Sequence, residues 1–454
     1  MDTKKLRQKI LDLAIHGKLV PQDPNDEPAS VLLERIRVEK EQLIKEGKIK
    51  APKKSKTAGD TSHYGKEEPW ELPEGWCWST IGDIFLHNTG KALNASDKEG
   101  KKLTYITTSN LYWDRFELST LKEMPFTKSE IEKCTASKGD LLVCEGGDIG
   151  RAAIWQYDYD IRIQNHIHRL RGLGEVNHRL FLFWFMYLKT TGLIGGKGIG
   201  LMGLSSGELD KLEIPVPPLR EQGSIVRKID NLFIAIQKLD EECSLLMTNI
   251  EQSKSKILDL AIHGKLMPQD PADEPAFKFL RRINPEFKPS DNLHYEGNIP
   301  NGWQLVSFED IFKTIPSKMY QISMKEITEK GQFPVISQGA KYIDGYSNNS
   351  HRVFNVKEPI IIFGDHSKVL KYVEHDFIVG ADGVKILSPR WVSKYLYYHL
   401  MLSVSTLENR GYSRNFQFLS SKSFLIPPFK EQCRIVSAIE DVFAQLEFIA
   451  EITT

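Results

Sequence analysis

The sequence lacks three things, and each absence excludes a class of protein. Lysine and arginine total 60 and aspartate and glutamate total 60, so charge alone does not drive nucleic-acid binding as it does in histone-like proteins. The five cysteines are scattered without a CxxC pair, which indicates neither a zinc site nor a disulfide framework and leads us to expect a cytoplasmic protein. The longest apolar run, Leu180 to Leu188, is too short to cross a bilayer, and the charged first residues do not read as a targeting signal.

Motifs of common enzymes are also missing. The closest approach to a phosphate-binding loop, around Gly195 and Gly198, has Thr191 where the first glycine is required. An amino-methyltransferase would carry Asn or Asp before Pro-Pro-Phe, but here Ile426 precedes that triplet. No GxSxG, HExxH or kinase signature is present. These absences argue against each of those enzyme classes.

What the chain does contain is a duplication. Its 454 residues exceed what one hydrophobic core usually organises, and 41% hydrophobic with 26% charged residues suits folded domains. Residues 10–29 read ILDLAIHGKLVPQDPNDEPA and residues 257–276 read ILDLAIHGKLMPQDPADEPA, which are identical at 18 of 20 positions. We infer that the protein is built from two divergent copies of one unit.

Two weaker markers accompany each copy of this block. The markers are LPEGW at 72–76 with DIF at 83–85, matched by IPNGW at 299–303 with DIF at 310–312, and PPLREQ at 217–222, matched by PPFKEQ at 427–432. The segments between the markers share little sequence. Conserved markers around divergent segments predict two domains of one design but different surfaces.

The order of the markers predicts one long central helix over residues 215–265, because this stretch contains PPLREQ and ILDLAIHGK in series. Its apolar residues recur in steps of three, four or seven, at Val226, Ile229, Phe233, Ile236, Cys243, Met247, Ile250, Ile257 and Ala261. Asp240 and Lys254 interrupt this seam. A helix of about 45 residues would span about 65 Å.

The two ends of the chain repeat the same seam. It recurs at Val436, Ile439, Phe443 and Leu446 and continues at Ile10 and Ala14. We expect the termini to form a second, broken helix antiparallel to the first, giving a two-helix coiled coil with pseudo-two-fold symmetry. The alternative is a set of separate amphipathic helices, each packed on its own domain.

Six segments follow from these patterns: a repeat helix and linker (1–66), a first domain (67–214), the central helix (215–265), a linker (266–295), a second domain (296–425) and a C-terminal helix (426–454). A basic cluster in the first linker, Lys48, Lys50, Lys53, Lys54 and Lys56, either touches phosphate or is simply solvated. Strand-like runs at 140–144 and 359–363 and late helices at 179–189 and 394–404 predict mixed α and β domains, and thus an α+β protein whose late helices are core.

Loops at matching places in the two domains are candidate nucleic-acid contacts. EGGDIGR (145–151) and GDHSK (364–368) each follow a strand, and small residues beside Arg or Lys allow the backbone to approach phosphate, although turn chemistry explains the glycines equally well. Amide and cationic side chains nearby can pair with base edges, although a polar loop explains them too. The candidates are Gly147, Arg151, Gln164, Asn165, His166, Arg169 and Lys197 in the first domain, and Gln338, Lys341, His366, Lys368, Arg410, Arg414 and Asn415 in the second.

The ILDLAIHGKLVPQDPNDEPA block, and two unlike segments each followed by PP-[LF]-[RK]-EQ, resemble the specificity subunit of type I restriction-modification systems over essentially the whole chain. The resemblance implies that the divergent segments are target recognition domains, each reading one half of a split, asymmetric DNA site. It implies that the shared helices act as a ruler and dock two modification subunits, with restriction subunits joining them. Residues for these helix roles would be Ile10, Val226, Ile229, Phe233, Ile257, Val436, Ile439 and Phe443.

By the same resemblance, this chain has no catalytic activity of its own and carries no cofactor or metal, while S-adenosylmethionine, ATP and magnesium belong to the partner subunits. Two other classes remain open from the residues alone. A coiled-coil scaffold would bind proteins through both domains and show no sequence-dependent DNA binding. A nuclease or fused modification enzyme would turn over without partners.

Overall fold

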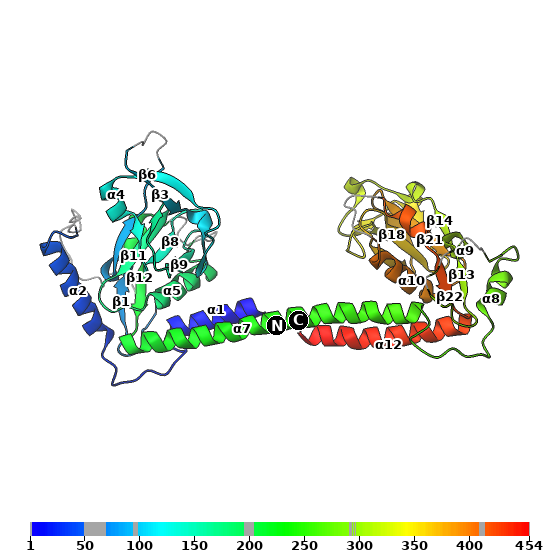
Figure 1. Cartoon of the computed structure of the whole chain (residues 1–454), viewed down its shortest axis with the longest axis horizontal. Helices are drawn as coiled ribbons and strands as arrows, with labels where there is room; N and C mark the ends of the chain where they lie inside the picture. The colour runs from blue at the N-terminus through cyan, green and yellow to red at the C-terminus, as the bar shows by residue number, and fades with distance from the viewer. Residues whose placement is uncertain are drawn as a thin grey trace. The chain divides into compact units, whose positions relative to one another are not determined.

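The computed structural model describes residues 2–49, 70–93, 99–194, 204–289, 293, 295, 297–407 and 414–453. The chain divides into two compact units, Met1–Glu241 and Glu242–Thr454. Each unit holds a mixed α/β domain together with helices (Figure 1). The prediction of two repeated domains of mixed class is confirmed.

The domain of the first unit is built on two four-stranded sheets. One has the order β2-β11-β8-β9 and comprises β2 (Phe85–Thr89), β11 (Ile167–Gly172), β8 (Leu141–Cys144) and β9 (Ala152–Ile154). The other has the order β6-β3-β10-β7 and comprises β6 (Lys122–Phe126), β3 (Lys101–Ile106), β10 (Ile161–Ile163) and β7 (Thr135–Ala136), with β3 and β10 parallel. β8 is buried on both faces: Leu141 and Val143 join one core, Leu142 and Cys144 another.

The domain of the second unit repeats this topology strand for strand. Its sheets have the orders β14-β21-β18-β19 and β16-β15-β20-β17. The strands are β14 (Phe312–Ile315), β21 (Val384–Pro389), β18 (Ile360–Gly364), β19 (Leu370–Val373), β16 (Gly345–Ser347), β15 (Phe333–Ile336), β20 (Phe377–Val379) and β17 (Val353–Phe354). β15 and β20 are parallel, as β3 and β10 are. The divergent sequences therefore encode one fold.

A short antiparallel ladder ties the start of each domain to its end. β1 (Cys77–Thr80) pairs with β12 (Glu213–Val216), and β13 (Gln304–Val306) pairs with β22 (Phe424–Ile426). The short helices are α3 (Ile81–Ile84), α4 (Lys128–Lys133), α6 (Ser206–Asp210), α9 (Phe308–Ile311) and α11 (Phe416–Ser420), and a small hairpin joins β4 (Leu111–Tyr112) to β5 (Arg115–Phe116). Single turns of 3₁₀ helix are η1 (Thr108–Asn110), η2 (Lys318–Tyr320), η3 (Met324–Glu326) and η4 (Ser350–Arg352). Each ladder lies directly before a long helix.

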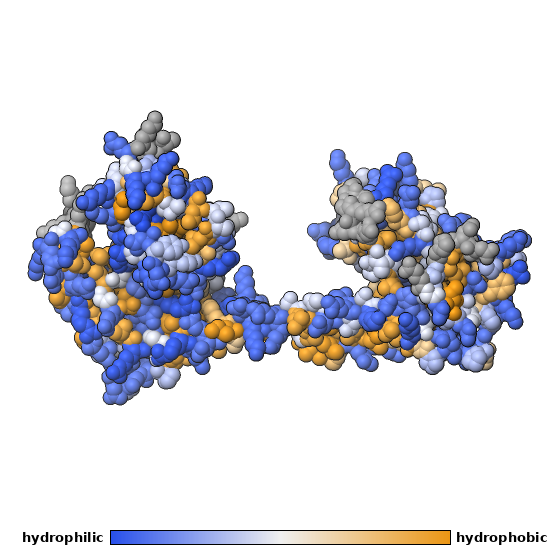
Figure 2. Space-filling view, in the orientation of Figure 1, coloured by the Kyte–Doolittle hydropathy of each residue, from blue (hydrophilic) through white to orange (hydrophobic). Residues whose placement is uncertain are grey.

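Helix α7 (Leu219–Ile262) is continuous over 44 residues, which confirms the predicted central helix. In the first unit it packs antiparallel against α1 (Thr3–Ile15), and in the second against α12 (Phe429–Thr453). The charged interruptions of the apolar seam make the contacts: Arg7 lies 2.9 Å from Asp240, and Lys254 lies 3.2 Å from Glu447. The surface of α12 includes hydrophobic side chains (Figure 2), among them Phe448, Ile449 and Ile452.

The predicted linker 266–295 contains a helix, and so does the stretch that leads into the predicted linker of the first segment. α2 (Ala29–Lys45) and α8 (Ala276–Ile283) follow the identical blocks, and the backbone N–H of the first residue of each donates 2.8 Å to a glycine carbonyl, Gly75 and Gly302 respectively. Lys48 forms an ion pair with Glu46 at 2.8 Å. Lys50, Lys53, Lys54 and Lys56 lie outside the described residues.

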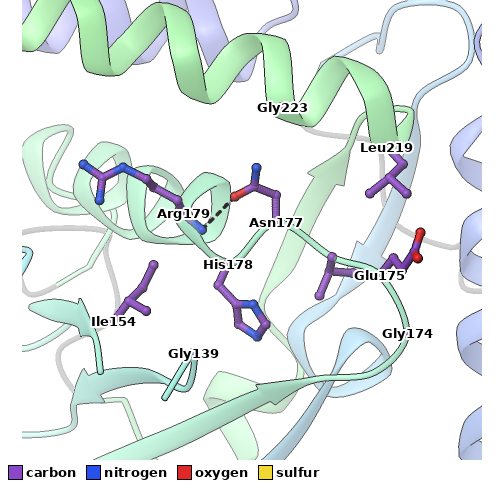
Figure 3. A pocket seen from close by; sticks show the side chains of 10 residues that line it. Gly139, Ile154, Gly174, Glu175, Asn177, His178, Arg179, Leu219 and Gly223 are labelled. Carbon is purple, nitrogen blue, oxygen red and sulfur yellow. Dashed lines mark hydrogen bonds between the residues drawn. The ribbon is translucent and has the colours of Figure 1, made fainter. Parts of the chain in front are cut away.

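The late helices begin with ion pairs to the long helices. In α5 (His178–Thr190) the Oδ1 atom of Asn177 accepts a hydrogen bond from the backbone N–H of Arg179 at 3.1 Å, beside an open hollow (Figure 3). The Arg179 guanidinium pairs with Asp230 at 2.7 Å and Asp114 at 2.8 Å. In α10 (Lys394–Ser405), Lys394 pairs with Glu440 at 2.7 Å, the counterpart of Asp230 after a shift of 210.

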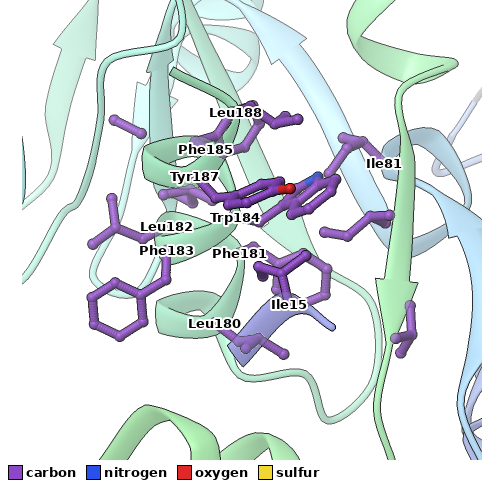
Figure 4. Packing of buried hydrophobic residues seen from close by; sticks show 14 of the residues in the cluster. Ile15, Ile81, Leu180, Phe181, Leu182, Phe183, Trp184, Phe185, Tyr187 and Leu188 are labelled. Atoms are coloured by element: carbon purple, nitrogen blue, oxygen red, sulfur yellow. The ribbon is translucent and has the colours of Figure 1, made fainter. Parts of the chain in front are cut away.

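The apolar run predicted to be core is core. Phe181 and Phe185 on α5 are fully buried, and Figure 4 shows them among the side chains that pack with Ile15 and Ile81. Burying a side chain of this size contributes about 1.5–3 kcal/mol. Among the described helices, none is both long enough and apolar enough to cross a membrane.

Candidate nucleic-acid interface

Loops from four places in the first domain meet at one end of its sheets. The N–H of Glu145, after β8, donates to the carbonyl of His166 at 3.0 Å, and the N–H of Asn165 donates to the carbonyl of Lys91 at 2.9 Å. The Arg151 Nη2 atom donates to the carbonyl of Thr108, in η1, at 2.7 Å. The structure therefore brings the predicted candidates of the β8–β9 and β10–β11 loops together.

Some of these candidates face solvent. The side chain of His166 is 54% exposed and lies 3.7 Å from Glu145, and Gln164 and Asn165 are partly exposed beside it. Gly147 has φ +73 with nothing within 4 Å of where a Cβ would lie. This backbone conformation explains the glycine without a ligand, while the open space around it leaves room for one. We define the first reading loop as Gln164, Asn165 and His166.

Two of the arginines predicted to contact DNA instead make contacts within the first domain. Arg169 is 5% exposed and donates to the carbonyl of Thr135, and burial lowers its pKa. The Arg151 guanidinium lies 3.8 Å from Asp148 and 5.3 Å from the ring centre of Tyr112, and its side chain is 18% exposed. Both positions support the fold rather than project from it.

An exposed cation–aromatic pair escaped the sequence analysis. On the β4–β5 hairpin, the Arg115 guanidinium lies 4.6 Å from the ring centre of Tyr112, which is 37% exposed. Asp114 in the turn has φ +54 and is held by Arg179. The YWDRF sequence offered a signal, since alternating aromatic and charged residues around an Asp turn suit a hairpin. Arginine and tyrosine are groups that contact phosphate and bases.

The second domain assembles its loops at the equivalent end. Gln338, after β15, donates through Nε2 to the carbonyl of Asp382 at 3.0 Å and accepts through Oε1 from the N–H of His366 at 3.2 Å. Asn415 is 2% exposed and donates through Nδ2 to the carbonyl of Asp365 at 2.8 Å. Gln338 and Asn415 thus position the loop after β18, which carries His366.

Cationic candidates of the second domain differ in exposure. Lys368 has φ +60 and donates to the carbonyl of Leu407 at 3.2 Å, so its ammonium group is held beside α10. Lys341 and Arg414 are exposed. Lys197 and Arg410 lie outside the described residues. The two loop ends therefore present different chemical groups on the same scaffold.

The three repeated markers converge on one buried site in each unit. The Trp76 Nε1 and Gln22 Nε2 atoms donate to the Glu221 carboxylate at 2.9 and 3.1 Å, and the Trp303 Nε1 and Gln269 Nε2 atoms donate to Glu431 at 3.1 and 3.4 Å. Burial raises the pKa of both carboxyls. We call each arrangement a Trp-Gln-Glu clasp. It explains why the PQDP, PxGW and PPxxEQ motifs repeat together.

A chain of side chains also closes the first domain. The His168 ring donates through Nε2 to the carbonyl of Leu204 at 2.7 Å, because a carbonyl only accepts. The His168 Nδ1 atom lies 2.9 Å from His87 Nε2, and His87 Nδ1 lies 2.7 Å from Asp210. Burial lowers the pKa of His168 to about 4, so its ring is neutral near pH 7.

The eight residues predicted for the ruler and for docking lie in the packing of their own units. Ile10, Val226, Ile229 and Ile439 are buried, and Phe233, Ile257, Val436 and Phe443 are partly buried against the same cores. Such side chains hold helices to domains and leave little surface for another protein. Exposed apolar groups lie elsewhere, at Leu245, Phe448, Ile449 and Ile452 in the second unit.

Within the described residues, no group of three or more His, Cys, Asp or Glu side chains is arranged to hold a metal ion. The free Cys134 and Cys144 are buried, and burial raises the pKa of both thiols. A raised thiol pKa disfavours the reactive thiolate.

Comparison with known proteins places this fold in a family. A family model described as the type I restriction modification DNA specificity domain matches residues 73–242 and 300–454. The type I restriction enzyme EcoAI specificity subunit of Escherichia coli is 28% identical over 451 residues, covering 84% of this chain and 73% of that protein. The EcoEI specificity subunit of Escherichia coli is 30% identical over 345 residues, covering 62% of this chain and 55% of that protein.

A solved structure agrees at the level of fold. A structure reported for complex assembly and conformational transition of the type I R-M system matches with a TM-score of 0.56 and 17% identity, over 85% of this chain and 94% of that chain. The family match covers both domains and both PPxxEQ helix starts, while the repeated blocks at 10–29 and 257–276 lie outside the matched residues. This chain therefore belongs to the family of the type I restriction modification DNA specificity domain, as its sequence markers predicted.

Proposed function

We propose that this protein is the specificity subunit of a type I restriction-modification complex and reads a bipartite, asymmetric DNA site. The observation that carries the proposal is that two domains of one topology present different side chains at equivalent loop ends. The first reading loop offers Gln164, Asn165 and His166, whereas the equivalent β20–β21 turn reads Gly380-Ala-Asp-Gly383. Unlike surfaces on equal scaffolds suit two unlike half-sites.

In this proposal the chain itself catalyses nothing and acts in the cytoplasm. Two modification subunits bind it and use S-adenosylmethionine, and restriction subunits add ATP- and magnesium-dependent steps. Helix α7 with its antiparallel partners α1 and α12 forms a coiled-coil ruler that sets the separation of the half-sites. The interhelical pairs Arg7–Asp240 and Lys254–Glu447 support this role, since they fix helix register. The exposed apolar side chains of α12 are candidate contacts for a modification subunit.

The direct test is domain exchange. The full chain, assembled with modification subunits, is expected to shift duplexes carrying one split sequence, with affinity that falls as salt rises. Replacing residues 67–214 by the corresponding domain of a relative should change one half-site and keep the other. Sequencing of methylated adenines after expression reads both halves at once. A change in both half-sites, or equal binding to all sequences, would refute the proposal.

A further inference from the structure

We propose that a notch at the start of α7 in the first unit receives an arginine side chain from the modification subunit. The inference rests on the function proposed above and assigns one docking contact to it. The notch is a hollow of about 530 Å³ between the PQDP turn and the first turns of α7. The residues that matter to the argument are Asp23, Asp26, Arg220, Glu221, Ser224 and Arg227.

In the second unit, the position equivalent to the notch is occupied by the side chain of Arg434. There the Arg434 Nη2 atom lies 2.6 Å from Asp273 Oδ2, and the Asp273 side chain is 3% exposed. The hydrogen bond to Asp273 raises the pKa of Arg434, and the charges of Asp273, Glu431 and Asp270 raise it further. The repeat therefore supplies an internal comparison in which one buried carboxylate pairs with a guanidinium and two further carboxylates act on it through their charge.

The first unit keeps the carboxylates and lacks the guanidinium. Asp26, Asp23 and Glu221 are the counterparts of Asp273, Asp270 and Glu431, but Ser224 stands where the second unit has Arg434. The Asp26 carboxylate makes no hydrogen bond or ion pair with any residue the structure describes. The carboxylate that pairs with a guanidinium in one copy thus has no such partner among the described residues of the other.

Neither neighbouring arginine pairs with Asp26, although the charge of Arg220 acts on Asp23. Arg227 lies one turn further along α7, is exposed, and donates through Nη2 to the Ser224 hydroxyl at 3.1 Å. The Ser224 hydroxyl in turn donates to the carbonyl of Arg220 at 3.3 Å. A metal ion is a poor occupant, since the described residues contain no metal-binding group of carboxylates. A planar guanidinium suits the place because its counterpart occupies it in the second unit.

The notch makes the two copies unequal as docking sites. A partner that inserts an arginine beside Asp26 meets Arg434 at the equivalent place in the second unit, where like charge opposes it. Two identical modification subunits therefore bind the two units with different contacts. The first unit binds its copy through this ion pair, and the second unit does not.

The test supplies the missing guanidinium within the chain. In S224R the new side chain should pair with Asp26 as Arg434 pairs with Asp273, which closes the notch without unfolding the unit. Wild-type and variant chains carrying different tags are co-expressed with limiting modification subunit, and the complexes are counted by native mass spectrometry. We expect S224R and D26N each to weaken occupancy of one modification subunit about tenfold or more, with the second unaffected.

Matched controls separate charge from shape. S224A leaves the carboxylates open and should bind as wild type does, and thermal unfolding of S224R should be no lower than that of the wild type. In the S224R/D26N double variant the losses should not add, because both act on one contact. Wild-type occupancy in either S224R or D26N would overturn the inference while leaving DNA reading intact. A wild-type chain that takes up no modification subunit would instead overturn the proposed function, and the inference with it.

Discussion

At the scale of single residues, buried polar side chains connect segments of each unit that lie far apart in the sequence. The Trp-Gln-Glu clasps join three motifs that lie far apart in the sequence, with Glu221 and Glu431 at their centres. An indole N–H and an amide N–H satisfy each carboxylate, which is the condition for burying it at tolerable cost. The strong repetition of these motifs thus has a structural cause that is independent of any ligand.

A buried histidine makes the second unit sensitive to acid. His399 accepts through Nε2 from the N–H of Leu425 at 3.1 Å, and burial lowers its pKa from 6.5 to about 3. The unfolded chain binds this proton first, so the stabilising contribution is complete above pH 6.5 and is lost as pH falls from there toward 3. We expect the melting temperature of His399→Gln to fall less between pH 7 and pH 4 than that of the wild type.

Scanning calorimetry of the full chain at a series of pH values measures this difference. His375→Gln is the matched control, because His375 is an exposed histidine of the same domain. It should follow the wild-type profile. Parallel profiles for His399→Gln and the wild type would contradict the assignment.

His166 and Arg169 separate reading from folding. His166 is exposed in the first reading loop, so His166→Ala should weaken binding of the assembled complex to its DNA by about 1 kcal/mol or more and leave thermal stability unchanged. Arg169→Ala leaves a buried space and an unsatisfied carbonyl at Thr135, and should cost about 2–4 kcal/mol of stability. Fluorescence anisotropy with a cognate duplex and thermal melts distinguish them. Loss of stability in His166→Ala would show that this loop serves the fold.

At the scale of elements, the sequence predicted what depends on periodicity and missed what depends on tertiary contact. The step of apolar residues predicted α7 almost to its ends, and the run from Leu180 to Leu188 identified the core helix α5. Helix α8 lies in the segment predicted to be a linker, and α2 reaches into the linker predicted from residue 39 onward. Their extent was not predicted, because their charged residues obscure the apolar positions Leu32, Ile36, Phe279 and Leu280 that they bury. Short helices of this kind owe their stability to the surface they cover.

The candidate site was predicted only at the level of its loops. The glycine-rich segments after β8 and β18 fall at equivalent places, as the sequence indicated. The sequence did not predict which side chains face solvent, because Arg169 and Asn415 are polar and yet buried. Polar residue type alone does not separate a group that holds a loop from one that a ligand meets. The β4–β5 hairpin with Arg115 and Tyr112 was missed for a related reason: each of its strands has only two residues.

Arg179 is expected to control the attachment of that hairpin. Its guanidinium joins Asp230 of α7 to Asp114 of the hairpin turn, with side chains about one-third exposed. After allowance for solvent screening, Arg179→Met should cost about 1–2 kcal/mol and speed hydrogen exchange in residues 111–116. Lys394→Met removes only the single Glu440 pair in the second unit and should cost less. Equal exchange in the hairpin of variant and wild type would argue against this attachment.

At the scale of the whole molecule, the proposed ruler predicts a change in the DNA site rather than in its halves. Inserting about four or seven residues between Cys243 and Met247 adds one or two turns to α7, and each turn is about 5.4 Å. We expect the assembled complex to keep both half-sites and to methylate sites with a longer spacer. Methylated-adenine sequencing detects this directly. Substituting Ser244→Ala at the same place is the control and should leave the spacer as it is.

The two repeated blocks, identical at 18 of 20 positions, also suit recombination between the stretches that encode them. Both copies of the block form the same structure. Each copy begins in the last turns of a helix, α1 or α7, continues through the turn that carries the clasp glutamine, and ends at the first residue of α2 or α8. Recombination between the two encoding stretches would delete 247 residues in frame and join Met1–Lys9 to Ile257–Thr454. The product keeps Gln269, Trp303 and Glu431, so its clasp is complete. The deletion removes the first copy together with most of α7, and it leaves the start of α1 joined in phase to the last turns of α7, so the product keeps one complete unit.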